Sequence, residues 1–136
     1  MIVSVTFLKT TTPLRSMECR KIRRRLRIEY QPFFSKGYAI IPVNPSADMI
    51  LNRRCYHSLK EVDEHIDIIE VFRPSEEALS IVQEAIERKK EQGDIAVIWL
   101  QEGIRNEEAK MLAEKNGIIF IQDRCMFKEY NRAFSA

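Results

Sequence analysis

Glycine is scarce in this chain of 136 residues, which contains only four, and the first of them is Gly37. A phosphate-binding turn between a strand and a helix usually needs glycine, because its backbone must come close to the ligand. The first 36 residues therefore lack the glycine-bearing loop that marks many nucleotide-binding domains.

Cysteine and histidine are also few. The three cysteines, Cys19, Cys55 and Cys125, lie far apart and form no Cys-x-x-Cys pair. Their odd number and spacing argue against a disulfide framework or a zinc site, and fit a reducing cytoplasm. His57 and His65 belong to no Ser-His-Asp or Cys-His arrangement. We therefore expect a cytoplasmic protein with no metal site and no catalytic machinery of its own.

Long apolar runs are missing too, since none approaches the roughly 20 residues of a membrane span. Residues 1–8 are apolar, but no basic segment precedes them and no small-residue cleavage site follows, so we expect no signal peptide. The length and the 45% hydrophobic and 31% charged content are those of an ordinary globular protein. One domain over residues 1–136 with no membrane partner is the economical interpretation.

Charge is unevenly distributed, although the net charge is only +2. Residues 1–36 contain nine Lys/Arg and two Asp/Glu (net +7), whereas residues 37–136 contain thirteen and eighteen (net −5). Six of the cations fall in Arg20–Arg27, a density that would suit binding to nucleic-acid phosphates. No helix-turn-helix, zinc-finger or RNA-binding signature accompanies them, and a charged helix face is the more usual explanation.

From residue 37 onward, the hydrophobic pattern predicts the order strand, loop, strand, helix, strand, helix, strand. The strands are Ala39–Val43, Asp67–Phe72, Ile95–Leu100 and Ile118–Ile121. The last two are near-continuous apolar runs, typical of a parallel sheet with helices on both faces. Residues 1–8 could add one strand and residues 17–33 one helix. The pattern therefore predicts an α/β fold with a parallel sheet.

Two helices are predicted between the later strands. The first opens with Ser75 as its cap and ends at Gly93, after three cations that suit a helix carboxyl end. The second runs from about Asn106 to Lys115 and stops at Asn116-Gly117.

Unusual loops follow all four predicted strands. They read Pro42-Val43-Asn44-Pro45, Arg73-Pro74-Ser75, Gln101-Glu102-Gly103 and Gln122-Asp123-Arg124-Cys125. Each alone has an ordinary structural explanation, such as a shaped turn or a surface ion pair. Together, at the carboxyl edge of one parallel sheet, they predict a ligand cleft. No acid stands at Val43-Asn44, where a dinucleotide site would hold its ribose hydroxyls, which disfavours NAD.

These motifs resemble those of a known family. Matching stretches are Gly37–Pro45, Cys55–Leu59, Val71–Pro74, Trp99–Gly103 with Asn106–Ala109, and Asp123–Cys125. Over residues 37–129 the chain is similar to the small single-domain CoA-binding proteins, which are related to the CoA-binding domain of the succinyl-CoA synthetase alpha subunit. The resemblance implies a Rossmann-like sheet of about five parallel strands and a nucleotide-type ligand, coenzyme A or an acyl-CoA.

By position, the resemblance also implies a set of ligand-lining residues. Val43, Asn44 and Pro45 would line the nucleotide side of the cleft. Phe72, Arg73 and Pro74 would border it after the next strand, and Gln101 and Gly103 would approach the ligand from the loop after that. Gly103 would allow close approach of the backbone, and Arg73 would be a charge partner for a phosphate.

Two other functions stay open at this point. The chain could be a scaffold or interaction module that has lost ligand binding, or an acyl-CoA-dependent enzyme or regulator with Cys125 as its reactive candidate. CoA binding ranks first and nucleic-acid binding well below it. The sequence does not decide whether several copies assemble into an oligomer.

Residues 9–34 depart from the family pattern, and three explanations compete. The segment could have diverged, with its basic side chains supplying the phosphate charge. It could be a solvated basic helix in a protein that no longer binds CoA. It could also come from a shifted reading frame, since the similarity is lost and recovered abruptly.

Overall fold

The computed structural model of the chain describes residues 2–8, 38–44, 48–50, 53–125, 128, 129 and 132. Its main feature is a sheet in which every pair of neighbouring strands is parallel. In spatial order the strands are β2 (Tyr38–Val43), β1 (Ile2–Leu8), β5 (Ile68–Phe72), β6 (Val97–Leu100) and β7 (Ile119–Ile121). The predicted α/β class with a parallel sheet is therefore confirmed, and residues 2–8 supply the additional strand.

The strand order reverses at β1. The chain places β2 on one side of β1 and then crosses to β5 on the other side, after which β6 and β7 continue in that direction. At the carboxyl end of β1, Phe7 is in register with Val43 of β2, and Leu8 is in register with Phe72 of β5. The ends of β2 and β5 therefore flank the end of β1. In open α/β sheets, the crevice at such a reversal is where ligands bind.

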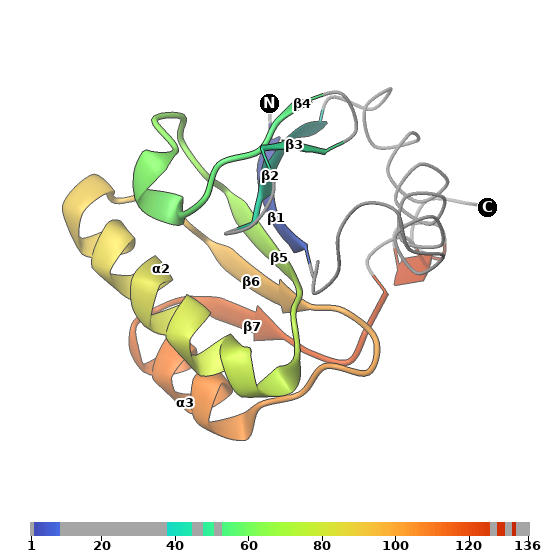
Figure 1. Cartoon of the computed structure of the whole chain (residues 1–136). Helices are drawn as coiled ribbons and strands as arrows, with labels where there is room; N and C mark the ends of the chain where they lie inside the picture. Colours follow the sequence, from blue (N-terminus) through green and yellow to red (C-terminus); the bar gives the residue numbers. More distant parts are fainter. Residues whose placement is uncertain are drawn as a thin grey trace.

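Two helices pack side by side on one face of the sheet (Figure 1). They are α2 (Ala78–Gln92), preceded by the 3₁₀ turn η2 (Ser75–Glu77), and α3 (Glu107–Lys115). The helix predicted over residues 17–33 lies outside the described residues, so helices on both faces of the sheet stay a prediction.

The helix ends mostly follow the sequence-based predictions. Gly93 ends α2 in the left-handed region with φ 72°, and its N–H donates to the Lys89 carbonyl at 2.8 Å. Asn106 caps α3 by accepting the Ala109 N–H at 2.9 Å. The prediction that Ser75 caps α2 is wrong. Its Oγ accepts the Arg105 N–H instead, at 3.1 Å, because the 3₁₀ turn moves the start of α2 beyond its reach.

The core lies between the sheet and these helices. Ile69, Val71, Ile98 and Leu100 point from the central strands into it and are fully buried. They meet the apolar faces of the helices, formed by Ala78, Ile81, Val82, Ala85, Ile86, Ala109 and Ala113. Burial of this kind contributes about 25 cal/mol for each Å² of apolar surface and fixes the strand ends that form the site.

The connection between β2 and β5 was predicted to be a loop, and it contains more structure than that. It holds a two-stranded antiparallel hairpin, β3 (Met49–Ile50) and β4 (Arg53–Arg54), followed by the 3₁₀ turn η1 (Leu59–Glu61). Such short strands carry little hydrophobic pattern of their own, which explains why the sequence did not reveal them.

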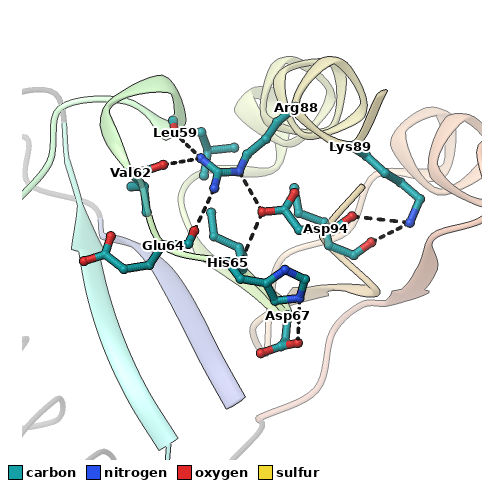
Figure 2. A network of polar contacts seen from close by, with 10 residues as sticks. Leu59, Val62, Glu64, His65, Asp67, Arg88, Lys89 and Asp94 are labelled. Atoms are coloured by element: carbon teal, nitrogen blue, oxygen red, sulfur yellow. Dashed lines mark hydrogen bonds and ion pairs between the residues drawn. The ribbon is translucent and has the colours of Figure 1, made fainter. Parts of the chain in front are cut away.

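A buried ion pair fastens the opposite, amino edge of the sheet (Figure 2). The Arg88 guanidinium donates to Asp94 Oδ2 at 3.0 Å, and both side chains are at most 5% exposed. The same guanidinium donates to three carbonyls of the segment before β5, those of Leu59, Val62 and Glu64, at 2.6 to 2.8 Å. This edge is closed by its own hydrogen bonds, whereas the loops at the carboxyl edge carry the candidate site.

Candidate ligand site

The end of β2 is bonded to a residue of the following segment. Val43 and Asn44 are 1% and 0% exposed. The Asn44 N–H donates to the Tyr56 carbonyl at 2.8 Å, and the Tyr56 N–H donates to the Pro42 carbonyl at 3.0 Å. Tyr56 thus extends the sheet beyond β2 at the level of Val43. Pro45, the third residue predicted here, lies outside the described residues.

Tyr56 also supports a cation. The Arg54 guanidinium carbon lies 4.7 Å from the centre of the Tyr56 ring, within the range of a cation–π contact. Between them, Cys55 is buried, and this burial raises the pKa of its thiol to about 11. His57 faces Asp48, with 3.0 Å between Nε2 and Oδ1.

After β5, the predicted residues begin the next helical segment. Arg73 Nε donates to Glu77 Oε2 at 2.5 Å, and the Arg73 side chain is 15% exposed. The Pro74 carbonyl accepts the Glu77 N–H at 2.9 Å. The charge of Arg73 is therefore already balanced by a carboxylate, a partner that the sequence alone did not identify.

After β6, Gln101 turns its side chain into the protein. Its Nε2 donates to Glu70 Oε1 at 2.9 Å, and its own Oε1 accepts the Glu102 N–H at 3.1 Å. Gly103 follows, exposed and with φ 88°, and no atom lies within 4 Å of the position that a Cβ would occupy. This turn therefore offers open space and backbone to a ligand rather than the Gln101 side chain.

The loop after β7 is bonded to this turn. Asp123, with φ 57°, accepts the Gly103 N–H on Oδ1 at 2.7 Å, and its Oδ2 lies 3.4 Å from Arg105 Nη1. The Gly103 N–H first, and then Arg105 and Arg124, lower the pKa of the Asp123 carboxyl. An aspartate tolerates the left-handed region better than most residues do.

Further hydrogen bonds join the loop after β5 to the same assembly. Asn106 Nδ2 donates to the Ser75 carbonyl at 2.9 Å, and the Asn106 N–H donates to Gln122 Oε1 at 3.0 Å. We call the connected loops, residues 73–75, 101–106 and 122–124, the tethered wall. It links the carboxyl ends of β5, β6 and β7.

A cavity of about 760 Å³ opens beside this wall, at the ends of β6 and β7. Trp99, Arg105, Asp123 and Arg124 are among its lining residues. Its size is within the range of small-molecule sites, but it lies to one side of the strand reversal at β1. Among the described residues, no cluster of three or more His, Cys, Asp or Glu side chains is placed to hold a metal ion.

The structure brings the described members of the predicted set to one edge of the sheet, on both sides of the β1 end. Sequence reasoning missed Arg54, Tyr56 and Glu70 as parts of this edge. A partial signal existed for Glu70, because a carboxylate inside an apolar strand must be hydrogen-bonded or exposed.

None of the helices within the described ranges is long and apolar enough to cross a membrane.

Comparison with known proteins gives one family. The family described as "CoA binding domain" matches residues 18–131, which include the basic run Arg20–Arg27 and all strands from β2 onward. The uncharacterized protein YneT of Bacillus subtilis (strain 168) is 42% identical over 90 residues, 66% of this chain. That alignment spans 63% of YneT, so the chain matches less than two thirds of this curated relative.

Solved structures with the same fold were also found. The cell-free ID.343 protein from Thermus thermophilus has a TM-score of 0.72 at 25% identity, covering 98% of this chain and 91% of that one. A dinucleotide forming acetyl-coenzyme A synthetase 1 from Ca. Korarchaeum cryptofilum, in complex with phosphate and ADP, has a TM-score of 0.59. At 15% identity, with 86% of this chain and 25% of the synthetase covered, the second likeness concerns the fold alone.

Proposed function

Because this chain belongs to the family of CoA binding domains, we propose that it binds coenzyme A or an acyl-CoA at the carboxyl ends of its parallel strands. The family match over residues 18–131 is the observation that carries the proposal. The reversal of strand order at β1 supports the location, because doubly wound sheets bind nucleotides at that point.

In this proposal the nucleotide lies beside Val43 and Asn44, and Pro45, the next residue in the sequence, also lines the site. Phe72 and the Arg73-Pro74 pair form the opposite side of the cleft, across the end of β1. The Gln101 backbone and Gly103 contribute from the tethered wall. Arg73 would contribute to a phosphate site as a member of its ion pair with Glu77 rather than as an isolated cation.

We propose no reaction for the chain by itself. Cys125, the thiol that an acyl-CoA-dependent enzyme would use, is 3% exposed. Burial also raises the pKa of Cys55, and a thiol rather than a thiolate is a poor nucleophile. A cytoplasmic compartment, where such free thiols stay reduced, is part of the proposal.

Titration calorimetry with CoA, acetyl-CoA, NAD and ATP tests the proposal directly. CoA or acetyl-CoA should bind more tightly than the other two. At about 100 times its dissociation constant, a ligand stabilises the fold by roughly 2.7 kcal/mol, which a thermal-shift measurement detects. The absence of both heat and thermal shift with CoA and acetyl-CoA near millimolar concentration would reject it.

Two glycines provide a matched test of the location. Gly103 and Gly93 have similar positive φ angles, 88° and 72°, and both have open space where a Cβ would lie. Replacing either with alanine should cost stability by about 1–2 kcal/mol through backbone strain. Only Gly103→Ala should weaken CoA binding, since Gly93 ends α2 at the opposite edge. Equal affinities for the two variants would remove Gly103 from the site.

A second function has one observation in its favour. The Gly103 N–H and the Arg73 guanidinium, two groups expected to face the ligand, already bond to Asp123 and Glu77. A module that has kept the fold but lost its ligand would have this arrangement. The calorimetry distinguishes the two functions, and Arg73→Ala adds detail: a weaker CoA affinity would place Arg73 in the site.

A further inference from the structure

We infer that Arg54 recognises a phosphate group on the ribose of the bound nucleotide, as in the 3′-phosphate of coenzyme A. The inference rests on the proposed function and adds to it the group that would distinguish coenzyme A from dephospho-coenzyme A. The 2′-phosphate of NADP⁺ has the same chemistry, so the test must separate the two ligands.

The backbone places Tyr56, on whose ring the Arg54 guanidinium stacks, at the carboxyl end of β2. Tyr56 bonds to Pro42 and to Asn44, one residue to each side of Val43 at the end of β2. Since β2 is the outermost strand on its side of the sheet, Tyr56 borders the outer side of that end. In this fold the nucleotide ribose lies at the end of the second strand, and an arginine nearby accepts a ribose phosphate. Arg54 lies two residues before Tyr56.

The Tyr56 ring fixes the Arg54 guanidinium. The 4.7 Å separation is that of a cation stacked on an aromatic face, while Arg54 itself remains exposed. Tyr56 in turn packs against the hydrophobic core, so the platform is anchored. A guanidinium held in this way loses little side-chain entropy on binding and still presents its planar fork, which matches a phosphate in bidentate geometry.

Arg54 also differs from the other arginines in its charge balance. Each of the other arginine side chains that the structure describes is in an ion pair: Arg73, Arg88, Arg105, Arg124 and Arg132. Arg54 has no ion pair with any residue in the described ranges. The Asp48 carboxylate, which belongs to the same connection, faces His57. The Arg54 charge is therefore available to an anion.

The residue after β2 agrees with this assignment. A carboxylate there would accept hydrogen bonds from free ribose hydroxyls and would repel a phosphate. Asn44 carries no charge and is fully buried, with its N–H bonded to Tyr56. From the sequence alone, the absence of an acid at Asn44 only disfavoured NAD. With the Arg54 guanidinium nearby, the same absence favours a ligand whose ribose carries a phosphate.

Calorimetry on the full chain tests the inference with four ligands: CoA, dephospho-CoA, NADP⁺ and NAD⁺. The wild-type protein should bind CoA about tenfold to a hundredfold more tightly than dephospho-CoA, which is the effect of a charged, bidentate hydrogen bond. Arg54→Ala should remove that difference by weakening CoA alone, and Arg54→Lys should keep part of it. Lys90→Ala is the control, since it removes one exposed positive charge from α2 near the opposite edge.

Each result has a defined meaning. If the wild type binds CoA and dephospho-CoA equally, or if Arg54→Ala weakens both equally, the inference is overturned while CoA binding stands. If CoA does not bind but NADP⁺ binds in an Arg54-dependent way and NAD⁺ does not, the proposed function fails and the role of Arg54 holds. If none of the four binds, both are overturned. Circular dichroism of Arg54→Ala checks that its fold is intact.

Discussion

Asp123 Oδ1 accepts the N–H of Gly103 at 2.7 Å, although the two residues are 20 positions apart in the sequence. Asp123 does so from a left-handed backbone conformation, and its own N–H donates to the Ile104 carbonyl at 3.1 Å. The turn after β6 and the turn after β7 are therefore held together by hydrogen bonds in both directions. These bonds join two of the three loops of the tethered wall.

Removing the Asp123 carboxylate should loosen the turn at Gly103. In Asp123→Ala, amide hydrogen exchange at Gly103 should become faster, because the N–H loses its acceptor and alanine disfavours the left-handed region. Asp123→Asn should retain most of the protection, since the amide oxygen can still accept and asparagine tolerates this conformation. If Gly103 exchanges at the wild-type rate in both variants, the bond does not hold the turn.

Acid should weaken the same bond. The folded-state pKa of Asp123 is lowered by the Gly103 N–H and by Arg105, so its ionised form stabilises the folded state above the unfolded value of about 3.9. That contribution is lost as the pH falls through the lower, folded-state pKa. In an NMR titration, the Gly103 amide shift should therefore have its midpoint below that of an unstructured aspartate. A midpoint at or above that value would contradict this account.

Breaking the buried ion pair at the amino edge should be costly. Arg88→Ala leaves the Asp94 carboxylate buried without its cation and removes the donor to three carbonyls. The expected loss of unfolding free energy is about 3–5 kcal/mol, measured by urea denaturation. Lys90→Ala, two positions on and exposed, should stay within about 0.5 kcal/mol of the wild type. Equal urea midpoints for the two variants would show that the network does not stabilise the fold.

The described thiols should be inert in the native protein. Cys55 and Cys125 are 4% and 3% exposed, and burial raises the pKa of Cys55 to about 11. A thiol reagent at pH 8 should therefore modify both residues slowly under native conditions and rapidly in urea, as measured by peptide mapping. Fast native labelling of Cys125 would revive the hypothesis that it is a reactive nucleophile.

Hydrophobic periodicity predicted much of the sheet and both described helices. The strands β2, β5, β6 and β7 were placed within two residues of their observed bounds, since the runs around Ile69 and Ile98 are apolar enough to identify buried strands. The short strands β3 and β4 were missed. Gly93, Asn106 and Asn116-Gly117 marked helix ends correctly. The capping hydrogen bonds and the left-handed glycine conformation that end a helix depend on residues within one turn. The cap at Ser75 failed because the 3₁₀ turn η2 delays the start of α2 to Ala78, and the Ser75 hydroxyl bonds to the distant Arg105 N–H instead.

The candidate site was harder to predict, because its character depends on pairs far apart in the sequence. The sequence showed that Arg73 and Gly103 follow strands, but not that Glu77 and Asp123 bond to them. Arg54 drew no attention because an arginine two residues before a tyrosine is common. Its importance depends on the backbone bonds that carry Tyr56 to the end of β2.

The tethered wall has a thermodynamic consequence. Loops that become ordered only when a ligand arrives lose conformational entropy at that moment and reduce the affinity. Here the turns after β5, β6 and β7 are already joined through Ser75, Asn106, Gln122 and Asp123. A ligand that contacts this side of the sheet finds it pre-organised. Binding there should therefore lose little conformational entropy, and most of the binding enthalpy is expected to appear as affinity.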